Sequence, residues 1–238
     1  MKIIIIFFSS ITFSFAQYSG RVTYKSFFSE SEATEELKTN NRMLYQEKLD
    51  EEMMAKMLRF SLDFNQDESL FYLSESMISD AEEIATKKYV TGLFYGYDKF
   101  YINKTTNELI EQLYYTFGVI LKKKESNFIH WELKNETKII NGYLCYKANY
   151  TYIQKWKGNE FPWKVVAWYC PSIPFNYGPI RYSGLPGMIL ELTEKKVGYI
   201  VEKIEFFDKK LQIKKPIEGE DLTDQQIIKR QNITRETD

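Results

Sequence analysis

Side chains able to do catalytic chemistry are few in type and widely spaced along the chain. His130 is the only histidine among the 238 residues, which excludes metal sites built from several histidines and leaves one candidate imidazole base. Five carboxylates lie on or near expected strands: Glu132, Glu136, Glu191, Glu202 and Glu205. Two converging carboxylates could perform acid–base hydrolysis, but charges that prevent the aggregation of strand edges explain the same pattern.

Motifs with a well-defined catalytic mechanism do not occur in the chain. There is no nucleophile elbow, phosphate-binding loop, zinc-protease helix or dinucleotide fingerprint. We therefore expect no catalytic residue, no metal site and no cofactor, and we favour a non-enzymatic protein. The alternative that stays open is an exported hydrolase that uses paired carboxylates. The net charge is −1, so there is no electrostatic reason to expect a nucleic-acid partner.

The two cysteines are spaced so that a hairpin would bring them together. Cys145 and Cys170 flank residues 154–160, which have the composition of a hairpin turn. With a two-residue turn at Lys157-Gly158, the numbers of opposite residues add to 315, as 145 and 170 do. We predict a disulfide between them in an oxidising compartment, provided that the register does not slip by one or two residues.

The N-terminus has the three parts of a secretory signal peptide. A positive start at Lys2 is followed by an apolar stretch over residues 3–15 and by a small-residue cleavage site that ends at Ala16. The apolar stretch is too short to span a membrane, and charges interrupt every later apolar run. The sequence thus predicts that residues 1–16 direct export to the periplasm, the cell envelope or the medium, with no transmembrane segment in the mature chain.

A stretch dense in proline and glycine, residues 168–192, is the feature around which the expected fold is arranged. It holds four of the six prolines and is otherwise mostly apolar, which indicates a rigid, bent segment packed on a core or lining a cavity. Gly184, Pro186 and Gly187 have the chemistry of a structural turn, because Pro186 suits the second position of a type II turn and Gly187 the third. The same segment could instead be presented to a ligand or partner. In that case the contacting residues are Trp168, Tyr169, Ile173, Tyr182, Leu185, Pro186 and Met188.

Residues 182–191, Y-S-G-L-P-G-M-I-L-E, resemble the signature of the GLPGLI family of exported Bacteroidetes proteins, with Met188 in place of a leucine. Similar motifs occur upstream in the family's order: W-E-L and E-T-K-I-I-N-G-Y-L-C-Y-K-A within residues 131–148, A-W-Y at 167–169, I-P at 173–174 and G-P at 178–179. Cys170 departs from the family's pattern. The resemblance is dense over residues 128–192 and implies export and a mainly β domain. It implies no established activity, and it carries over no catalytic residues.

Alternating apolar residues predict a mainly β (α+β) domain over residues 17–215. We expect a single curled antiparallel sheet or half-barrel of about ten strands, with one N-terminal helix over 42–59 and the Pro/Gly-rich loop. The expected strands cover residues 18–28, 58–64, 69–77, 94–102, 108–121, 127–133, 139–153, 162–169, 188–193, 199–207 and 211–214, with Asn141-Gly142 as an alternative tight turn. In the polar tail, residues 216–238, Thr223 and Gln226 resemble a capping box and predict a short helix.

These features favour an exported, non-enzymatic binding or accessory protein of the periplasm or envelope. Aromatic residues make up 16% of the chain and the Pro/Gly-rich stretch is apolar, so the expected partner is an apolar small molecule or lipid, or an outer-membrane or envelope protein. We expect this partner to bind at the face near Trp168–Met188.

Overall fold

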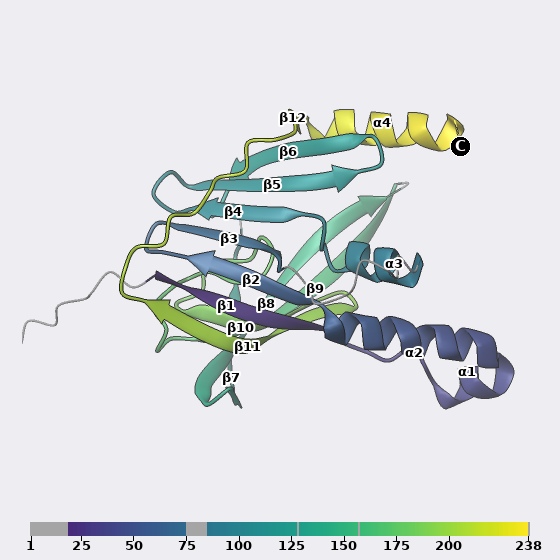
Figure 1. The fold of residues 1–238 in the computed structure, drawn as a ribbon, viewed down its shortest axis with the longest axis horizontal. Coiled ribbons are helices and arrows are strands. Elements are labelled where there is room, and N and C mark those ends of the chain that lie inside the picture. The colour runs from purple at the N-terminus through teal and green to yellow at the C-terminus, as the bar shows by residue number, and fades with distance from the viewer. Residues whose placement is uncertain (1–18, 75–84, 128, 157, 238) are drawn as a thin grey trace, which may run out of the picture.

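The computed structural model describes residues 19–74, 85–127, 129–156 and 158–237, and the signal peptide predicted at 1–16 lies outside these ranges. Within them the chain forms twelve strands and four helices (Figure 1). The strands are β1 (Ser19–Phe28), β2 (Arg59–Phe64), β3 (Glu68–Leu73), β4 (Lys99–Asn103), β5 (Glu108–Tyr115), β6 (Gly118–Glu125), β7 (Glu132–Ile140), β8 (Tyr143–Trp156), β9 (Asn159–Cys170), β10 (Met188–Glu194), β11 (Val197–Phe207) and β12 (Glu220–Asp221). The helices are α1 (Glu35–Asn40), α2 (Arg42–Met57), α3 (Ala85–Leu93) and α4 (Asp224–Thr237). None of the helices in these ranges has the length and apolarity needed to cross a membrane.

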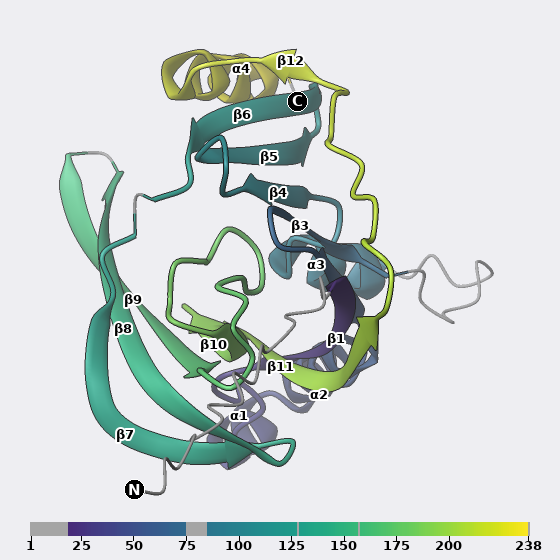
Figure 2. The same ribbon diagram turned by 90° about the vertical axis from the view of Figure 1, so that its left-hand side faces the viewer.

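All twelve strands belong to one sheet, in the order β12-β6-β5-β4-β3-β2-β1-β11-β10-β9-β8-β7. Neighbouring strands are antiparallel except β12 and β6, where Glu220 lies beside Ile120 in a parallel pair. The chain reaches β12 through a long irregular connection that leaves β11 and runs along one side of the sheet (Figure 2). Parallel neighbours require a crossover of this kind, because a tight turn can only join antiparallel strands.

The predicted fold class is therefore wrong. The protein is not a single antiparallel sheet or half-barrel with one helix, but a large mixed sheet that does not close, with four helices among the described residues. Helix α1 escaped prediction because it buries none of its side chains and so has no apolar period. Its start depends on local polar contacts instead, since the Thr34 hydroxyl accepts the N–H of Leu37 at 3.1 Å.

Several local predictions are confirmed. Helix α2 occupies the predicted segment, and β2 and β3 form the predicted hairpin. Asn141 and Gly142 form the tight turn between β7 and β8, with φ angles of 49° and 83°. The capping box is formed as well, because the N–H of Thr223 donates to the Gln226 side chain at 2.8 Å.

Other strand predictions are wrong in their bounds. The strand expected over residues 108–121 is two strands, β5 and β6, which turn between Tyr115 and Gly118. The segment 211–214 forms no strand, and helix α3 (Ala85–Leu93) was not predicted. Charged residues hide these features, because β6 carries three consecutive lysines that are typical of a solvated turn.

The cysteine hairpin has the predicted register, but the disulfide is not formed. Tyr146 lies opposite Tyr169, so the numbers of facing residues add to 315 as expected. Cys145 and Cys170 are nonetheless buried free thiols. Each sulfur has a local polar contact, Cys145 with the Tyr143 carbonyl at 3.5 Å and Cys170 with the Ser172 hydroxyl at 3.0 Å. Burial raises the pKa of Cys145 to about 12, which keeps this thiol protonated and unreactive.

The Pro/Gly-rich segment between β9 and β10 is part of the core. It lies on the inner side of the bent sheet (Figure 2), and its apolar side chains belong to the same buried cluster as Phe60 and Tyr199 of the sheet. Gly187 has a φ of +148°, and a Cβ at this position would lie 2.2 Å from the Cys170 carbonyl oxygen. Only glycine therefore allows the segment to pass so close to the end of β9.

Candidate functional site

The loop residues expected to contact a partner are mostly buried. Five of them are no more than 6% exposed: Tyr169, Ile173, Tyr182, Leu185 and Met188. Trp168 is half-buried, and the Lys138 ammonium lies 4.4 Å from the centre of its ring. Pro186 is exposed. The segment therefore packs its apolar side chains inward and offers no continuous apolar face to a partner.

The five carboxylates selected from the sequence do not converge. Each forms an ion pair of its own: Glu132 with Lys134, Glu136 with Lys147, Glu191 with Lys138, Glu202 with Arg59 and Glu205 with Lys203. His130 is exposed just before β7. In the described part of the chain, no group of three or more His, Cys, Asp or Glu side chains is placed to hold a metal ion.

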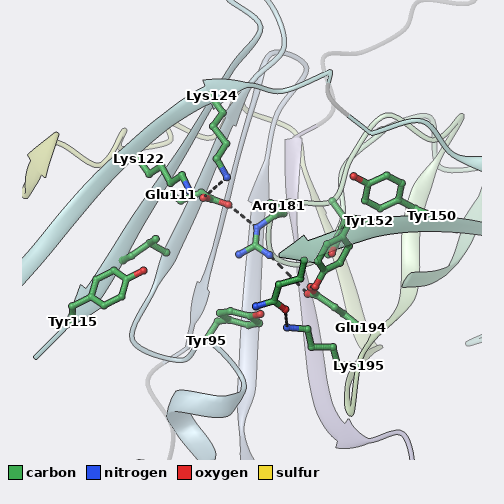
Figure 3. A pocket seen from close by; sticks show the side chains of 13 residues that line it. Tyr95, Glu111, Tyr115, Lys122, Lys124, Tyr150, Tyr152, Arg181, Glu194 and Lys195 are labelled. Carbon is green, nitrogen blue, oxygen red and sulfur yellow. Dashed lines mark hydrogen bonds and ion pairs between the residues drawn. The ribbon is translucent and has the colours of Figure 1, made fainter. Parts of the chain in front are cut away.

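Two other carboxylates do converge, on a pocket of about 370 Å³ (Figure 3). Glu111 on β5 and Glu194 at the end of β10 lie on either side of Arg181, which belongs to the Pro/Gly-rich segment. The remaining lining residues come from β5, β6, β8, two turns and the Pro/Gly-rich segment itself: Tyr95, Leu113, Tyr115, Lys122, Lys124, Tyr150, Tyr152, Gln154, Tyr182 and Lys195. The strands on the two sides are far apart in the sheet, so the pocket exists because the sheet bends around the segment that carries Arg181.

Arg181 and Glu111 form the buried centre of the site. The Arg181 Nε donates to Glu111 Oε1 at 2.6 Å, and Lys124 donates to Glu111 Oε2 at 3.0 Å. The Glu111 side chain is only 3% exposed and that of Arg181 19%. Burial opposes the ionisation of Glu111, but the nearby charges of Arg181 and Lys124 outweigh it and hold the pKa of this carboxyl below its usual range. Both oxygens of Glu111 are thus occupied by cationic donors.

Glu194 is buried with one oxygen left over. The Tyr152 hydroxyl donates to Glu194 Oε1 at 2.7 Å. Arg181 Nη1 is 3.9 Å from Glu194 Oε2, which is an ion pair but too long for a hydrogen bond. Glu194 Oε2 is buried without a hydrogen-bond partner. Buried polar atoms nearly always have a partner, so a missing one calls for an explanation at this position.

The backbone around the pocket is held in an unusual conformation at three residues. Tyr95, Ile180 and Lys195 have φ angles of 55°, 57° and 54°. For a β-branched residue such as Ile180 this left-handed conformation is a genuine outlier that costs about 1–3 kcal/mol. Ile180 places its own side chain in the core, and the next residue, Arg181, reaches the pocket. Strain of this kind is concentrated at functional sites, where the surrounding structure maintains it.

Residues 157–191 match the model of a family described as a protein of unknown function (Porph_ging). The matched stretch includes all of β9, the segment between β9 and β10 and the start of β10, and therefore Arg181. No curated protein matches the chain.

Two solved structures of PNGF-II are similar to the chain at a low level. The one in the C2 space group has 14% identity and a TM-score of 0.47, over 82% of this chain and 28% of that chain. The one in the P21 space group has 16% identity and a TM-score of 0.46, over 83% and 29% of the two chains. The chain thus spans less than a third of the length of these structures.

Sequence reasoning missed the residues at the centre of this site. Glu111 and Glu194 look like ordinary strand charges, and nothing local indicates that they meet. One signal was available, because Arg181 is the only charged residue between Trp168 and Leu190. A lone guanidinium in a rigid apolar segment must find buried acceptors or a cavity, since burying an unpaired charge is too costly.

Proposed function

We propose that this protein is an exported binding protein that holds a small polar ligand in the pocket around Arg181. The observation that carries the proposal is the Arg181–Glu111–Glu194 cluster, three charged side chains buried at a pocket of about 370 Å³. This volume is within the range of small-molecule sites.

A cluster of buried charges stabilises a core less well than apolar side chains would. Taking charges out of water costs several kcal/mol per ion, and apolar side chains of similar volume usually stabilise a fold as well or better. The strained backbone at Ile180 adds to this cost. Buried charges that line a concave pocket are a common feature of ligand sites, and here the pocket contains both donors and acceptors.

The same geometry argues against a hydrolase with paired carboxylates. Such a mechanism needs one carboxylate free to act as base or nucleophile and another that holds a proton. Glu111 cannot fill either role, because Arg181 and Lys124 occupy its oxygens and lower its pKa. Only Glu194 has a free oxygen, so the pocket offers one such acid rather than a pair.

Export is supported by the N-terminal sequence and by the resemblance of residues 182–191 to the GLPGLI signature. We propose that the ligand is bound in the periplasm or cell envelope. The polar lining favours a polar ligand over the lipid or apolar molecule that the sequence alone suggested, because the apolar side chains of residues 168–188 are mostly buried.

Native mass spectrometry of the mature protein, purified from its own host, tests this function. We expect extra mass that disappears on denaturation. The conservative variant Arg181→Lys should lose that mass, because lysine cannot reach both carboxylates with the planar donors of a guanidinium. The matched control Arg59→Lys, which alters a surface pair with Glu202, should keep it. A bare chain mass for the wild-type protein would contradict the proposal.

A further inference from the structure

The lining of the Arg181 pocket is unbalanced in charge. Four basic residues and two acidic residues line it: Lys122, Lys124, Arg181 and Lys195 against Glu111 and Glu194. Lys122 also pairs with Asp224 at the start of α4. Among the lining residues themselves basic groups therefore outnumber acidic ones, which favours an anion inside the pocket, although Asp224 and Asp98 offset this charge from outside the lining.

Arg181 has donors to spare. A guanidinium carries five N–H groups; the bond from Nε to Glu111 uses one of them and a side-chain hydrogen bond with Tyr95 another, so most remain. Nη1 stands 3.9 Å from Glu194 Oε2, beyond hydrogen-bond distance. The centres of the Phe100 and Tyr95 rings lie 5.1 Å and 5.3 Å from the guanidinium carbon, so aromatic rings pack against it. Arginine held in this way is suited to bind a carboxylate or phosphate with two parallel hydrogen bonds.

Glu194 requires a hydrogen-bond donor from the ligand, whereas Arg181 requires an acceptor. Its Oε2 accepts no hydrogen bond, although the side chain is only 2% exposed and lines the pocket. A carboxylate oxygen accepts hydrogen bonds, so the group that completes this contact is a donor. A ligand hydroxyl or amine at this position would remove the one unsatisfied acceptor at the centre of the pocket.

From these two features, and resting on the proposed function, we infer that the ligand is a small organic anion that also carries hydroxyl or amine donors. Its anionic group binds to Arg181 and the adjacent lysines, and a donor binds to Glu194 Oε2. Two tyrosines of β8 also line the pocket, and the Tyr150 and Tyr152 rings stack with centres 6.1 Å apart. A ring-sized hydroxy acid fits the chemistry and the volume of about 370 Å³.

Three ring compounds of similar size separate the two requirements. Glucuronate carries a carboxylate and hydroxyls, glucose carries hydroxyls only, and cyclohexanecarboxylate carries a carboxylate only. Titration calorimetry on the full mature protein should find that glucuronate binds at least about tenfold more tightly than either of the others. Equal binding of glucose would overturn the anion requirement, and equal binding of cyclohexanecarboxylate would overturn the donor requirement.

The variant Glu194→Gln assigns the donor contact to its residue. It should reduce glucuronate affinity about tenfold or more relative to that of cyclohexanecarboxylate, because only the first ligand donates to this position, whereas the lost negative charge affects both anions alike. Glu191→Gln is the matched control on the same strand β10, since Glu191 pairs with Lys138 and does not line the pocket. An equal loss for both compounds in Glu194→Gln would contradict the inference.

Failure of this inference can be told apart from failure of the proposed function. If none of the three compounds binds but the protein from its host still carries extra mass, the ligand class is wrong and the binding function stands. If the protein carries no ligand and none of the compounds binds, both are wrong.

Discussion

The Arg59–Glu202 and Arg181–Glu111 pairs consist of the same side chains at the same N···O distance, 2.6 Å, but they lie in different surroundings. The first pair is at the surface, with side chains 33% and 39% exposed. The second lies beside a pocket, with side chains 19% and 3% exposed. The surface pair is even the bidentate one. Residue type and the shortest N···O distance therefore do not distinguish the ion pair of the proposed site from a surface pair. Burial, a second carboxylate and an unsatisfied acceptor do.

Replacing the arginine of each pair should give the largest difference in stability between the two pairs. Arg181→Met leaves Glu111 and Glu194 buried beside an apolar side chain, which should lower the free energy of unfolding by about 3–5 kcal/mol. Arg59→Met should lower it by about 1 kcal/mol or less. Urea denaturation at pH 7 measures both. Similar losses in the two variants would show that the Arg181 cluster is not energetically special.

The segment that positions Arg181 gives the next largest effect. Gly187→Ala places a Cβ against the Cys170 carbonyl in a backbone conformation that alanine rarely adopts, so we expect a loss of about 2–4 kcal/mol. Gly184 also has a positive φ, +88°, but a Cβ there would have no neighbour within 4 Å. Gly184→Ala should therefore cost only about 1 kcal/mol. Thermal unfolding of both variants measures the two losses of stability. Backbone strain acts in both variants and close packing only in Gly187→Ala, so equal losses would argue against close packing at Gly187.

Asp98, behind the pocket, gives a smaller and pH-dependent effect. Burial raises its pKa to about 6, partly offset by the N–H of Tyr114, which donates at 2.9 Å, and by Arg181. The folded state then binds this proton more tightly than the unfolded chain, so its contribution to stability falls as pH rises from about 4 to about 6. Asp98→Asn should be about 1–2 kcal/mol more stable than wild type at pH 7.5 and equal to it near pH 4. Urea midpoints at the two pH values provide the measurement, and a difference that does not change with pH would refute this account.

The smallest stability effect is expected for Glu194→Gln. Glutamine keeps an oxygen that accepts from Tyr152, and the second oxygen has no hydrogen bond to lose. We expect a change below about 1 kcal/mol. Glu111→Gln, in contrast, weakens contacts to both Arg181 and Lys124 and should cost more. Denaturation curves that rank the two variants in the opposite order would place the structural role on Glu194.

Local sequence signals predicted the local structure well. The helix over residues 42–59, the hairpin of β2 and β3 and the Asn141-Gly142 turn each depend on a few neighbouring residues, and each was confirmed. The apolar residues of α2 do not form one buried face, however, since Met53 and Met57 are exposed. The register of β8 with β9 was predicted correctly from the position of the turn that joins the two strands. The parallel β12 could not be foreseen, because it depends on a long connection rather than on its own two residues.

Local sequence signals could not predict the candidate site, because its residues come together only in the complete sheet. Glu111 on β5 and Glu194 on β10 are far apart in the strand order. Both reach Arg181 only because the sheet bends around the segment that carries it. The sequence correctly marked the Pro/Gly-rich segment, but its apolar residues form the core and its single charged residue, Arg181, reaches the pocket. The single charged residue of this apolar loop was therefore the sequence signal that pointed to the candidate site.

The central claim, that the Arg181 pocket holds a ligand, is tested most directly by native mass spectrometry of Arg181→Lys and Arg59→Lys, each purified from the native host. The account predicts that Arg59→Lys retains the dissociable mass of the wild-type protein and that Arg181→Lys, folded like wild type, loses it. Retention of the same mass by Arg181→Lys would place the ligand elsewhere and contradict the account.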